Sequence, residues 1–290
     1  MSRLLVNADD FGLTHGVNRA IAELHAAGVL ASTTLMARAG ATEEATEIGL
    51  STPSLGVGCH VVLVDGTPVL SAPAEVPHLA DPAVNLFRPS MASFLRGLYA
   101  EGTRRSFRDQ IEAETRAQIE FLQNKGLTLT HIDTHKHTHM FPEVLRPVLR
   151  AARAAGIRAV RNPFEPAWAV RATAGARLAR IAEVSLLRWM KPVWKKILVE
   201  EGFTSTDGTI AVVGTGVLNA AMVRSLLGQL PAGTWELVTH PGYNDADLDQ
   251  IRTRLRASRD VEREALLTVR EFPEVELISF RDLQPGTAKD

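Results

Sequence analysis

The sequence has one cysteine, few aromatic residues and almost no net charge. The lone Cys59 excludes an intrachain disulfide framework and a zinc module built from several thiolates. With a formal net charge of −1, the chain lacks the overall positive charge that binding to a polyanion needs, so we expect no nucleic-acid partner. No run of about 18 apolar residues occurs, as a transmembrane helix would need. The first apolar run, Leu4 to Val6, is too short for a signal peptide, and we therefore expect a cytoplasmic protein.

The composition is that of an ordinary globular protein. Hydrophobic residues make up 45% of the chain and charged residues 22%, which argues against intrinsic disorder. A chain of 290 residues can bury a large core, and its length fits either one α/β barrel or two smaller domains.

Strand-like and helix-like segments alternate along the first half of the chain. The predicted strands cover residues 3–10, 32–36, 55–63, 127–134 and 157–160, and the predicted helices cover 17–27, 42–50, 107–125 and 142–155. Residues 64–88 are rich in proline and turn residues, and we expect a long surface loop there. Such alternation is typical of a parallel sheet with crossover helices.

A second region interrupts this alternation. An insert at about 166–208 precedes further strand-like segments at 210–213, 235–239 and 275–279. No linker rich in glycine, serine or proline divides the chain. We therefore predict one α/β domain over residues 1–290, a single TIM-like (β/α) barrel with a helical insert.

Polar side chains gather where the predicted strands end. They are Asp9 and Asp10, His60, the run from His131 to His139, Arg161 and His240. The carboxyl ends of all strands in a parallel barrel meet on one face, where active sites are built. Five segments that are far apart in the sequence would thus contribute to one site.

Asp9 and Asp10 end the first predicted strand. Neighbouring side chains on a strand point to opposite faces, but a turn at the strand end would let both carboxylates reach one site. A divalent cation there would offset their repulsion. The alternative is that one aspartate caps the next helix while the other is solvated.

A histidine-rich run follows the fourth predicted strand. His131, Asp133, His135, His137 and His139 alternate with other residues, and in an extended chain this period of two places all five side chains on one face. Histidines two residues apart can bind one metal, and the spacing does not decide which of the four is the ligand. Asp133 could instead accept a hydrogen bond from a ligating imidazole. The alternative is a fortuitous histidine-rich loop.

His60 and His240 complete the candidate site. A lone histidine in an apolar strand is usually a core residue, but with Asp10 and His135 it would make the three ligands of a catalytic metal with an open position for water. His240 is followed by a Pro-Gly turn that would hold the imidazole at the strand exit as a proton donor. The alternative for His240 is a hydrogen bond to the backbone alone.

Four motifs follow one another along the chain. They are Asn7–Gly12, Gly58–His60, Thr130–Pro142 and Thr239–Tyr243. Together they resemble the YdjC-like carbohydrate deacetylases, which include the ChbG-like chitooligosaccharide deacetylases. The resemblance implies a distorted (β/α) barrel of the glycoside hydrolase/deacetylase type, one divalent metal and hydrolysis of the N-acetyl group of an amino sugar. It also implies that Asp10, His60 and His135 bind the metal, that Asp9 is the general base and that His240 is the general acid.

Further segments resemble one subgroup of that family. Residues 61–70, 73–77 and 135–137 are similar to the deacetylases associated with hopanoid biosynthesis (HpnK type), whereas Thr138–Phe141 is closer to the general family pattern. The subgroup resemblance implies that the substrate is an N-acetylglucosaminyl hopanoid. A chitooligosaccharide is the alternative substrate.

These observations lead to the hypothesis of metal-assisted amide hydrolysis. The cation would bind the acetyl oxygen and the attacking water, Asp9 would take the water proton and His240 would protonate the leaving amine. Arg161 would assist at the oxyanion. Three other residues would contact the substrate or support the ligands: Asp133, His137 and His139. Zinc or magnesium fits the proposed ligands, and cobalt, nickel or manganese can also bind such a set.

Two other functions remain open at this point. A phosphoesterase on a similar barrel would use two metals and more ligands. A non-catalytic carbohydrate- or lipid-binding protein would keep a metal but release no acetate.

The predicted insert is rich in basic residues and tryptophan. Seven Lys or Arg residues, Arg177 among them, occur at 167–199 beside a single acid, Glu183, and three tryptophans lie among them. Basic helices with tryptophan can lie on anionic membrane surfaces, so residues 166–200 would suit a lipid-linked substrate and a peripheral location at the inner face of the membrane. The alternatives are a helical lid or a homodimer contact.

Overall fold

The computed structural model describes residues 2–173, 175 and 178–283. Its strands are β1 (Ser2–Phe11), β2 (Ser32–Leu35), β3 (Gly56–Val61), β4 (Ala80–Asp81), β5 (Leu86–Phe87), β6 (Ile132–Thr134), β7 (Gly208–Ile210), β8 (Gly233–Thr239) and β9 (Glu276–Ile278). Its α-helices are α1 (His15–Ala26), α2 (Thr42–Ser51), α3 (Met91–Leu98), α4 (Arg104–Asn124), α5 (Pro142–Ala154), α6 (Ala167–Ala172), α7 (Leu178–Leu187), α8 (Lys191–Glu201), α9 (Ala220–Leu227), α10 (Ala246–Asp249) and α11 (Ser258–Leu266). Short 3-10 helices are η1 (His135–Met140), η2 (Arg188–Met190), η3 (Leu267–Glu271) and η4 (Phe280–Leu283). Arg177 of the predicted insert lies outside the described residues.

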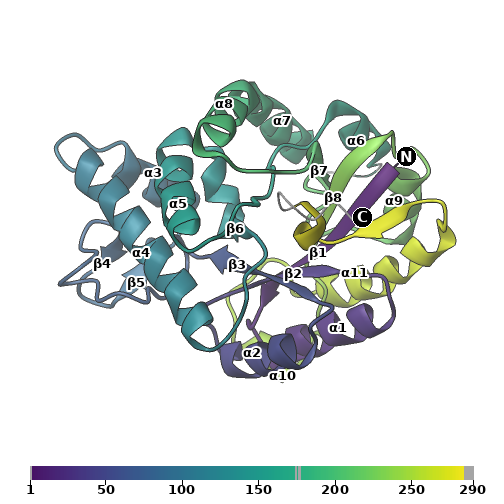
Figure 1. The fold of residues 1–290 in the computed structure, drawn as a ribbon, viewed down its shortest axis with the longest axis horizontal. Helices are drawn as coiled ribbons and strands as arrows, with labels where there is room; N and C mark the ends of the chain where they lie inside the picture. Colours follow the sequence, from purple (N-terminus) through teal and green to yellow (C-terminus); the bar gives the residue numbers. More distant parts are fainter. Residues whose placement is uncertain (1, 174, 176–177, 284–290) are drawn as a thin grey trace.

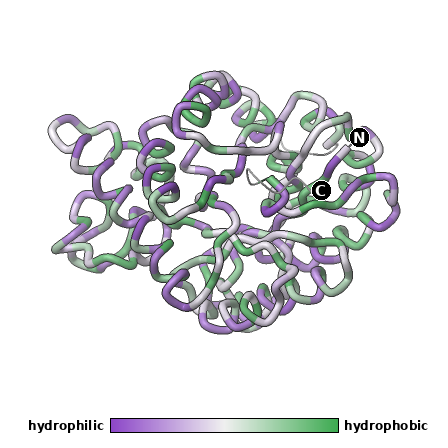
Figure 2. The backbone as a smooth tube through the Cα atoms, viewed as in Figure 1, coloured by the Kyte–Doolittle hydropathy of each residue, from purple (hydrophilic) through white to green (hydrophobic). Residues whose placement is uncertain are grey.

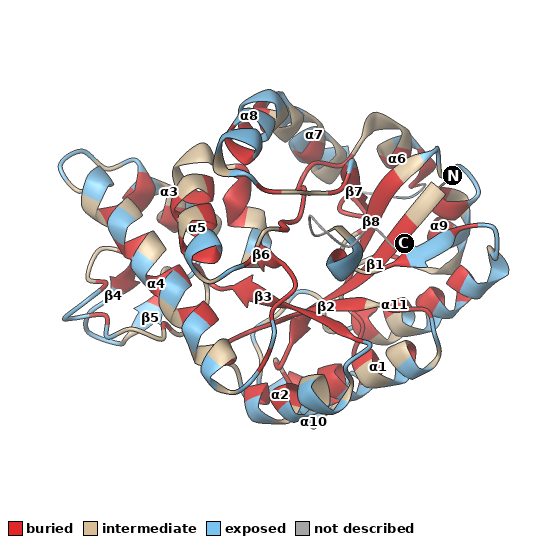
Figure 3. Ribbon diagram, viewed as in Figure 1, coloured by how far each residue is buried: buried red, intermediate tan, exposed pale blue. Residues whose placement is uncertain are grey.

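Seven of the described strands form one parallel sheet around β1 (Figure 1). The order from one edge to the other is β6-β3-β2-β1-β8-β7. β8 pairs with β1 along Ser2–Ala8, while on the opposite edge β9 pairs with Arg3–Leu5 and β2 pairs from Asn7 onward. Every residue of β2 and β3 is buried (Figure 3), although β2 reads Ser-Thr-Thr-Leu. The Thr33 hydroxyl, for example, donates a hydrogen bond to the Ala8 carbonyl at 2.8 Å.

The predicted closed barrel is not seen, and within the described residues the sheet forms a half-barrel. Beyond β6, only single parallel bridges continue it, from Ile132 to Val160 and from Ala159 to Thr204. The predicted strand at 157–160 is reduced to these bridges, with Ala159 and Val160 in parallel pairing on both sides. The alternation of strands and helices and the parallel sheet are confirmed.

Helices surround the sheet (Figure 1). The long helix α4 buries residues spaced three or four apart, such as Phe107, Ile111 and Ile119, and it packs against α5. Helix α1 begins where the Thr14 hydroxyl accepts a hydrogen bond from the Val17 amide at 3.2 Å. In Figure 3 the outward faces of these helices are exposed and the sheet is buried, so the apolar spacing predicted from the sequence faces the core.

Residues 64–88 are fixed more firmly than a surface loop. They contain the hairpin of β4 and β5. The buried Glu114 of α4 accepts hydrogen bonds from the Val69 and Leu70 amides at 2.8 and 3.0 Å. Gln110 of the same helix accepts bonds from the amides of His78 and Leu79. Polar side chains of α4 therefore anchor this segment beside the sheet.

The predicted insert contains α6, α7, η2 and α8. α8 packs on α5, and Val184 of α7 packs with Val212 and Val213, which follow β7. In the hydropathy view, hydrophobic and hydrophilic residues alternate along these helices (Figure 2). Among the described residues, no helix combines the length and the apolar character needed to span a membrane.

Candidate active site

The site lies at the carboxyl ends of β1, β3, β6 and β8. Asp9 and Asp10 both reach it because the end of β1 is irregular. The register between β1 and β2 shifts between Ala8 and Phe11, and Asp10 has a left-handed backbone with φ of 64°, which aspartate tolerates better than most residues. The shift interrupts the alternation of side chains between the two faces of β1. The two neighbouring carboxylates therefore contact one site, as predicted for the strand end.

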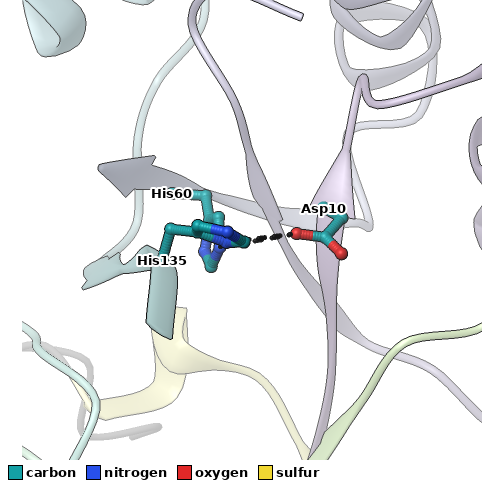
Figure 4. Close-up of side chains that lie close together, drawn as sticks. All are labelled: Asp10, His60 and His135. Carbon is teal, nitrogen blue, oxygen red and sulfur yellow. Dashed lines mark hydrogen bonds and ion pairs between the residues drawn. The ribbon is translucent and has the colours of Figure 1, made fainter. Parts of the chain in front are cut away.

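Asp10, His60 and His135 meet at one point (Figure 4). Asp10 Oδ1 lies 3.6 Å from His60 Nε2 and 3.6 Å from His135 Nδ1, and the two imidazole nitrogens are 3.2 Å apart. A tetrahedral zinc with bonds of about 2.0–2.1 Å has ligand atoms about 3.3 Å from one another. The three atoms therefore fit one divalent cation.

Asp133 sets the hydrogen-bonding state of His60. His60 Nδ1 lies 2.8 Å from Asp133 Oδ1, which leaves Nε2 free to face Asp10 and His135. Such a carboxylate contact is what orients a metal-binding imidazole. Burial opposes the charged form of His60, but the Asp133 carboxylate raises the pKa of this histidine to about 9. Asp133 thus supports a ligand, one of the two roles that the sequence left open.

His135 is held in the neutral form that binds metals. Burial lowers its pKa to about 4, although the neighbouring Asp10 carboxylate acts in the opposite direction. Burial also disfavours ionisation of Asp10, yet the Arg259 guanidinium keeps the pKa of Asp10 below its usual range. The site therefore presents one carboxylate and one neutral imidazole beside His60 at neutral pH.

A second set of neighbouring ligand atoms consists of Asp9, His60 and Asp133. Arg161 already contacts both of its carboxylates. Because the guanidinium neutralises them, this set is less suited to a cation than Asp10, His60 and His135. The geometry of the described residues favours a single metal position.

Arg161 is buried within three carboxylates, which we call the Arg161 cluster: Asp9, Asp133 and Glu236. Its Nη1 and Nη2 lie 2.8 and 2.6 Å from the two oxygens of Asp9, and its Nε lies 2.7 Å from Glu236. Nη1 also contacts Asp133, and Nη2 contacts Glu236. Every nitrogen of the guanidinium thus lies against a carboxylate oxygen. The predicted contact of Arg161 with a substrate oxyanion is not seen, because the buried guanidinium is directed at these three carboxylates.

The Arg161 cluster fixes the ionisation of Asp9. Burial disfavours the carboxylate, but the guanidinium outweighs it and holds the pKa of Asp9 well below its usual range. Asn7 Nδ2 donates a further hydrogen bond to Asp9 Oδ1 at 3.0 Å. Asp9 is thus ionised and held in one orientation beside the metal position.

His240 faces Asp9 from the end of β8. Its Nε2 is 3.8 Å from Asp9 Oδ2, and its Nδ1 is 3.8 Å from the buried Glu262. Burial opposes its charged form, but Glu262 and Asp9 raise the pKa of His240 above the usual value. Glu262 also accepts a hydrogen bond from the His240 amide at 2.7 Å. The imidazole of His240 is therefore held between Asp9 and Glu262, and these two carboxylates favour its cationic form.

Comparisons with known proteins identify the family of this chain. The sequence profile described as YdjC-like protein matches residues 3–273 of this chain. This chain belongs to the YdjC-like protein family. It is 30% identical over 270 residues to a carbohydrate deacetylase of Thermoanaerobacter pseudethanolicus, covering 92% of this chain and 91% of the relative. It is also 36% identical over 155 residues to a chitooligosaccharide deacetylase of Salmonella paratyphi B, covering 53% of this chain and 57% of that protein.

A solved structure shares the fold of this YdjC-like protein. It comes from Enterococcus faecalis V583 and is assigned only provisionally as a cellobiose-phosphate cleavage protein. The TM-score is 0.75 at 24% sequence identity, covering 97% of this chain and 98% of the other. At this identity the likeness supports the fold alone.

The sequence predicts that the histidine-rich run places its side chains on one extended face. The structure of this YdjC-like protein does not show such a face. The strand ends at Thr134, and Lys136 and His137 take left-handed conformations with φ of 57° and 52°. Only His135 therefore reaches the metal position. His139 instead lies with Nδ1 2.8 Å from the Thr134 hydroxyl and Nε2 3.0 Å from the Arg161 carbonyl.

The other two histidines of the run also lie away from the metal position. His131 is buried, stacks on Phe280 at 3.8 Å and has its Nε2 3.2 Å from Asn7 Oδ1. His137 is half-buried, and its Nδ1 has no hydrogen-bond partner among the described residues. The backbone turn at Lys136 separates these side chains, so the period of two does not survive in the structure.

The sequence reasoning missed Arg259, Glu262 and Glu236. Arg259 Nη2 lies 2.6 Å from Asp10 Oδ2, so α11 contacts Asp10 through Arg259 and His240 through Glu262. For these two residues the sequence carries no signal, because their burial is known only from the fold. For Glu236, the signal is a lone acid inside an apolar strand.

Proposed function

We propose that this protein is a metal-dependent N-deacetylase of N-acetylated amino sugars. One observation carries the proposal: three ligand atoms from Asp10, His60 and His135 lie 3.2–3.6 Å apart, with an ionised carboxylate and a cationic imidazole beside them. The deacetylases among the relatives support the same reaction class. When bound, a divalent cation would polarise the acetyl carbonyl and make a water molecule more acidic.

The residues around the metal position divide the proton transfers between them. Asp9, kept ionised by Arg161, accepts the proton of the attacking water. His240, kept cationic by Glu262 and Asp9, donates a proton to the amine as the carbon–nitrogen bond breaks. Their side chains are 3.8 Å apart, so acid and base act on the same reacting group.

Two imidazoles and one carboxylate favour zinc, cobalt, nickel or manganese over magnesium, which prefers oxygen ligands. We propose zinc as the resident metal. A phosphoesterase with two metals is the second candidate, and the second ligand set at Asp9, His60 and Asp133 is the observation that favours it. Metal analysis separates the two, because the deacetylase proposal requires one metal per chain.

For the substrate, we propose an N-acetylglucosaminyl hopanoid ahead of a chitooligosaccharide. The segment at 61–70, which resembles the hopanoid-associated subgroup, adjoins the metal position. Asp65 within it pairs with Lys136, the neighbour of His135, at 2.7 Å. We therefore expect this segment to contact the group attached to the sugar.

An acetate-release assay tests this proposal. The zinc-loaded protein is given chitobiose-type substrates and N-acetylglucosaminyl hopanoid, and we expect release from both, faster with the hopanoid. Asp9→Asn should keep the metal, and its rate of acetate release should fall about 10²–10⁴-fold, as expected for loss of a general base. Asp109→Asn, an exposed change on α4, is the matched control and should keep full activity. No acetate from any N-acetylated sugar, with the sugar retained by the protein, would instead indicate a non-catalytic binding protein.

A further inference from the structure

The segment formed by α7, η2 and α8 exposes large apolar side chains. Leu178, Leu186, Trp189 and Val193 have exposed fractions of 84%, 69%, 69% and 47%. We call these four residues the insert face. Tryptophan is rarely so exposed, and contiguous exposed apolar residues mark an interaction surface.

The insert face lies along one side of a continuous helical segment. Leu186, Trp189 and Val193 follow at intervals of three and four residues, the spacing of one helix face. Different residues attach the segment to the protein: Val184 packs on the loop after β7, and Trp194 is buried beside Phe164. The exposed apolar residues are thus not needed to hold the segment in place.

The charges around the insert face are positive. Residues 178–199 contain five Lys or Arg residues and one acid, Glu183, which pairs with Arg180 at 2.9 Å. At the end of α8, Glu200 and Glu201 pair with arginines of α5. Within the described part of the chain, Arg188 and Lys195 have no acidic partner.

The same helices border the active site. Val184 contacts Val212 and Val213, which follow the carboxyl end of β7 next to the β8 end that carries His240. The helical segment that carries the insert face therefore packs next to the strand ends that hold the site.

We propose that the insert face docks this protein on an anionic membrane surface, so that the active site meets a substrate carried by the bilayer. The lipid-borne substrate rests on the proposed function, whereas the docking does not. Tryptophan and leucine enter the interface between headgroups and acyl chains, and the positive charge of the same segment, which includes Arg188 and Lys195, attracts the anionic headgroups. A second copy of the chain fits less well, because a symmetric contact would bring the same unpaired cations together.

Vesicle co-sedimentation of the full-length protein tests this docking. The vesicles are phosphatidylcholine with or without phosphatidylglycerol. We expect binding only to the anionic vesicles, and about fivefold weaker binding for each cation removed in Arg188→Gln and Lys195→Gln. The variant Leu186→Ser/Trp189→Ser/Val193→Ser should lose binding. The control variant Val84→Ser/Leu86→Ser changes exposed apolar residues at the β4–β5 hairpin, distant from α7 and α8 (Figure 1), and should bind like the wild type.

Three results would overturn the docking: no binding of the wild type to anionic vesicles, equal binding of the triple serine variant, or a dimer in solution that this variant converts to a monomer. Release of acetate from a soluble N-acetyl sugar, measured on the same samples, separates the two proposals. We expect all these variants to keep it. If no sample releases acetate while the wild type binds vesicles, the proposed function fails and the docking stands.

Discussion

At the strand ends, Asp9, Asp10 and Asp133 each lie against an arginine, whereas on α7 and α8 the cations Arg188 and Lys195 have no acidic partner among the described residues. The difference follows from burial. A buried charge without a partner costs several kcal/mol, while an exposed charge keeps its hydration and remains free to attract a partner. The net charge of −1 thus conceals a positive segment at residues 178–199, which acidic residues elsewhere in the chain offset.

Removing the centre of the Arg161 cluster should have the largest effect on stability. Arg161→Met leaves three buried carboxylates without their cation, and we expect the free energy of unfolding in urea to fall by about 5 kcal/mol. The matched control is Arg146→Met, which breaks a surface pair with Glu200 and should cost about 1 kcal/mol or less. Similar losses in both variants would contradict the contrast between the buried and the exposed charges.

Removing a metal ligand should act on turnover instead of stability. His135→Ala should lose the bound metal and reduce acetate release by about 10³-fold, or about 4 kcal/mol of transition-state stabilisation. Metal content per chain and acetate release are the measurements. His78→Ala, on the 64–88 segment, should change neither of them. Full metal occupancy in His135→Ala would refute this ligand.

Glu165 follows the site segment at Arg161 and precedes the insert helices in the chain. It should make the free energy of unfolding depend on pH. It accepts hydrogen bonds from the Ala211 and Val213 amides at 2.8 and 2.7 Å, and burial raises its pKa to about 7. The folded state therefore binds this proton more tightly than the unfolded state, so its contribution to stability falls as pH rises from about 4.5 to about 7.

The substitution Glu165→Gln isolates this effect. As pH rises across that window, the free energy of unfolding of the wild type should fall by up to about 3 kcal/mol relative to that of the variant. Above the window the difference should not change further. Urea denaturation of both proteins between about pH 5 and pH 8 measures the difference. A constant offset, such as about 1 kcal/mol from one lost hydrogen bond, would show that Glu165 does not titrate in this range.

The insert face should contribute least to stability. In Leu186→Ser/Trp189→Ser/Val193→Ser, each change removes an exposed side chain, and we expect each to alter the free energy of unfolding by no more than about 0.5 kcal/mol. Val184→Ser, in the buried cluster of the same helix, should cost about 2 kcal/mol or more. Thermal unfolding of the two variants provides the comparison. A large loss in the triple variant would mean that the insert face is a packing surface.

Most of the chemically active residues could be found from the sequence, because polar residues at the ends of apolar strands are a local signal. Asp9, Asp10, His60, His135 and His240 do come together. The supporting arginine Arg259 could not be found in this way, because its contact with Asp10 joins residues 249 positions apart and neither segment indicates the other.

The histidine-rich run shows how local patterning fails. Because every second residue of the run is histidine or aspartate, the sequence predicts that five side chains share one face. Lys136 and His137 take left-handed conformations, and they turn the chain after His135. Neither lysine nor histidine favours that conformation strongly, so no propensity predicts it. The surrounding contacts, such as His139 on the Arg161 carbonyl, hold the turn in place.

The sequence by itself determined the alternation of strands and helices, the residue types of the site and the basic character of the insert, because periodicity and composition are properties of short segments. Tertiary structure decided which histidine joins Asp10, that Arg161 serves three carboxylates instead of the substrate, and that the sheet forms a half-barrel. Those outcomes depend on distances between segments far apart in the chain, and burial sets the cost of each unpaired charge there.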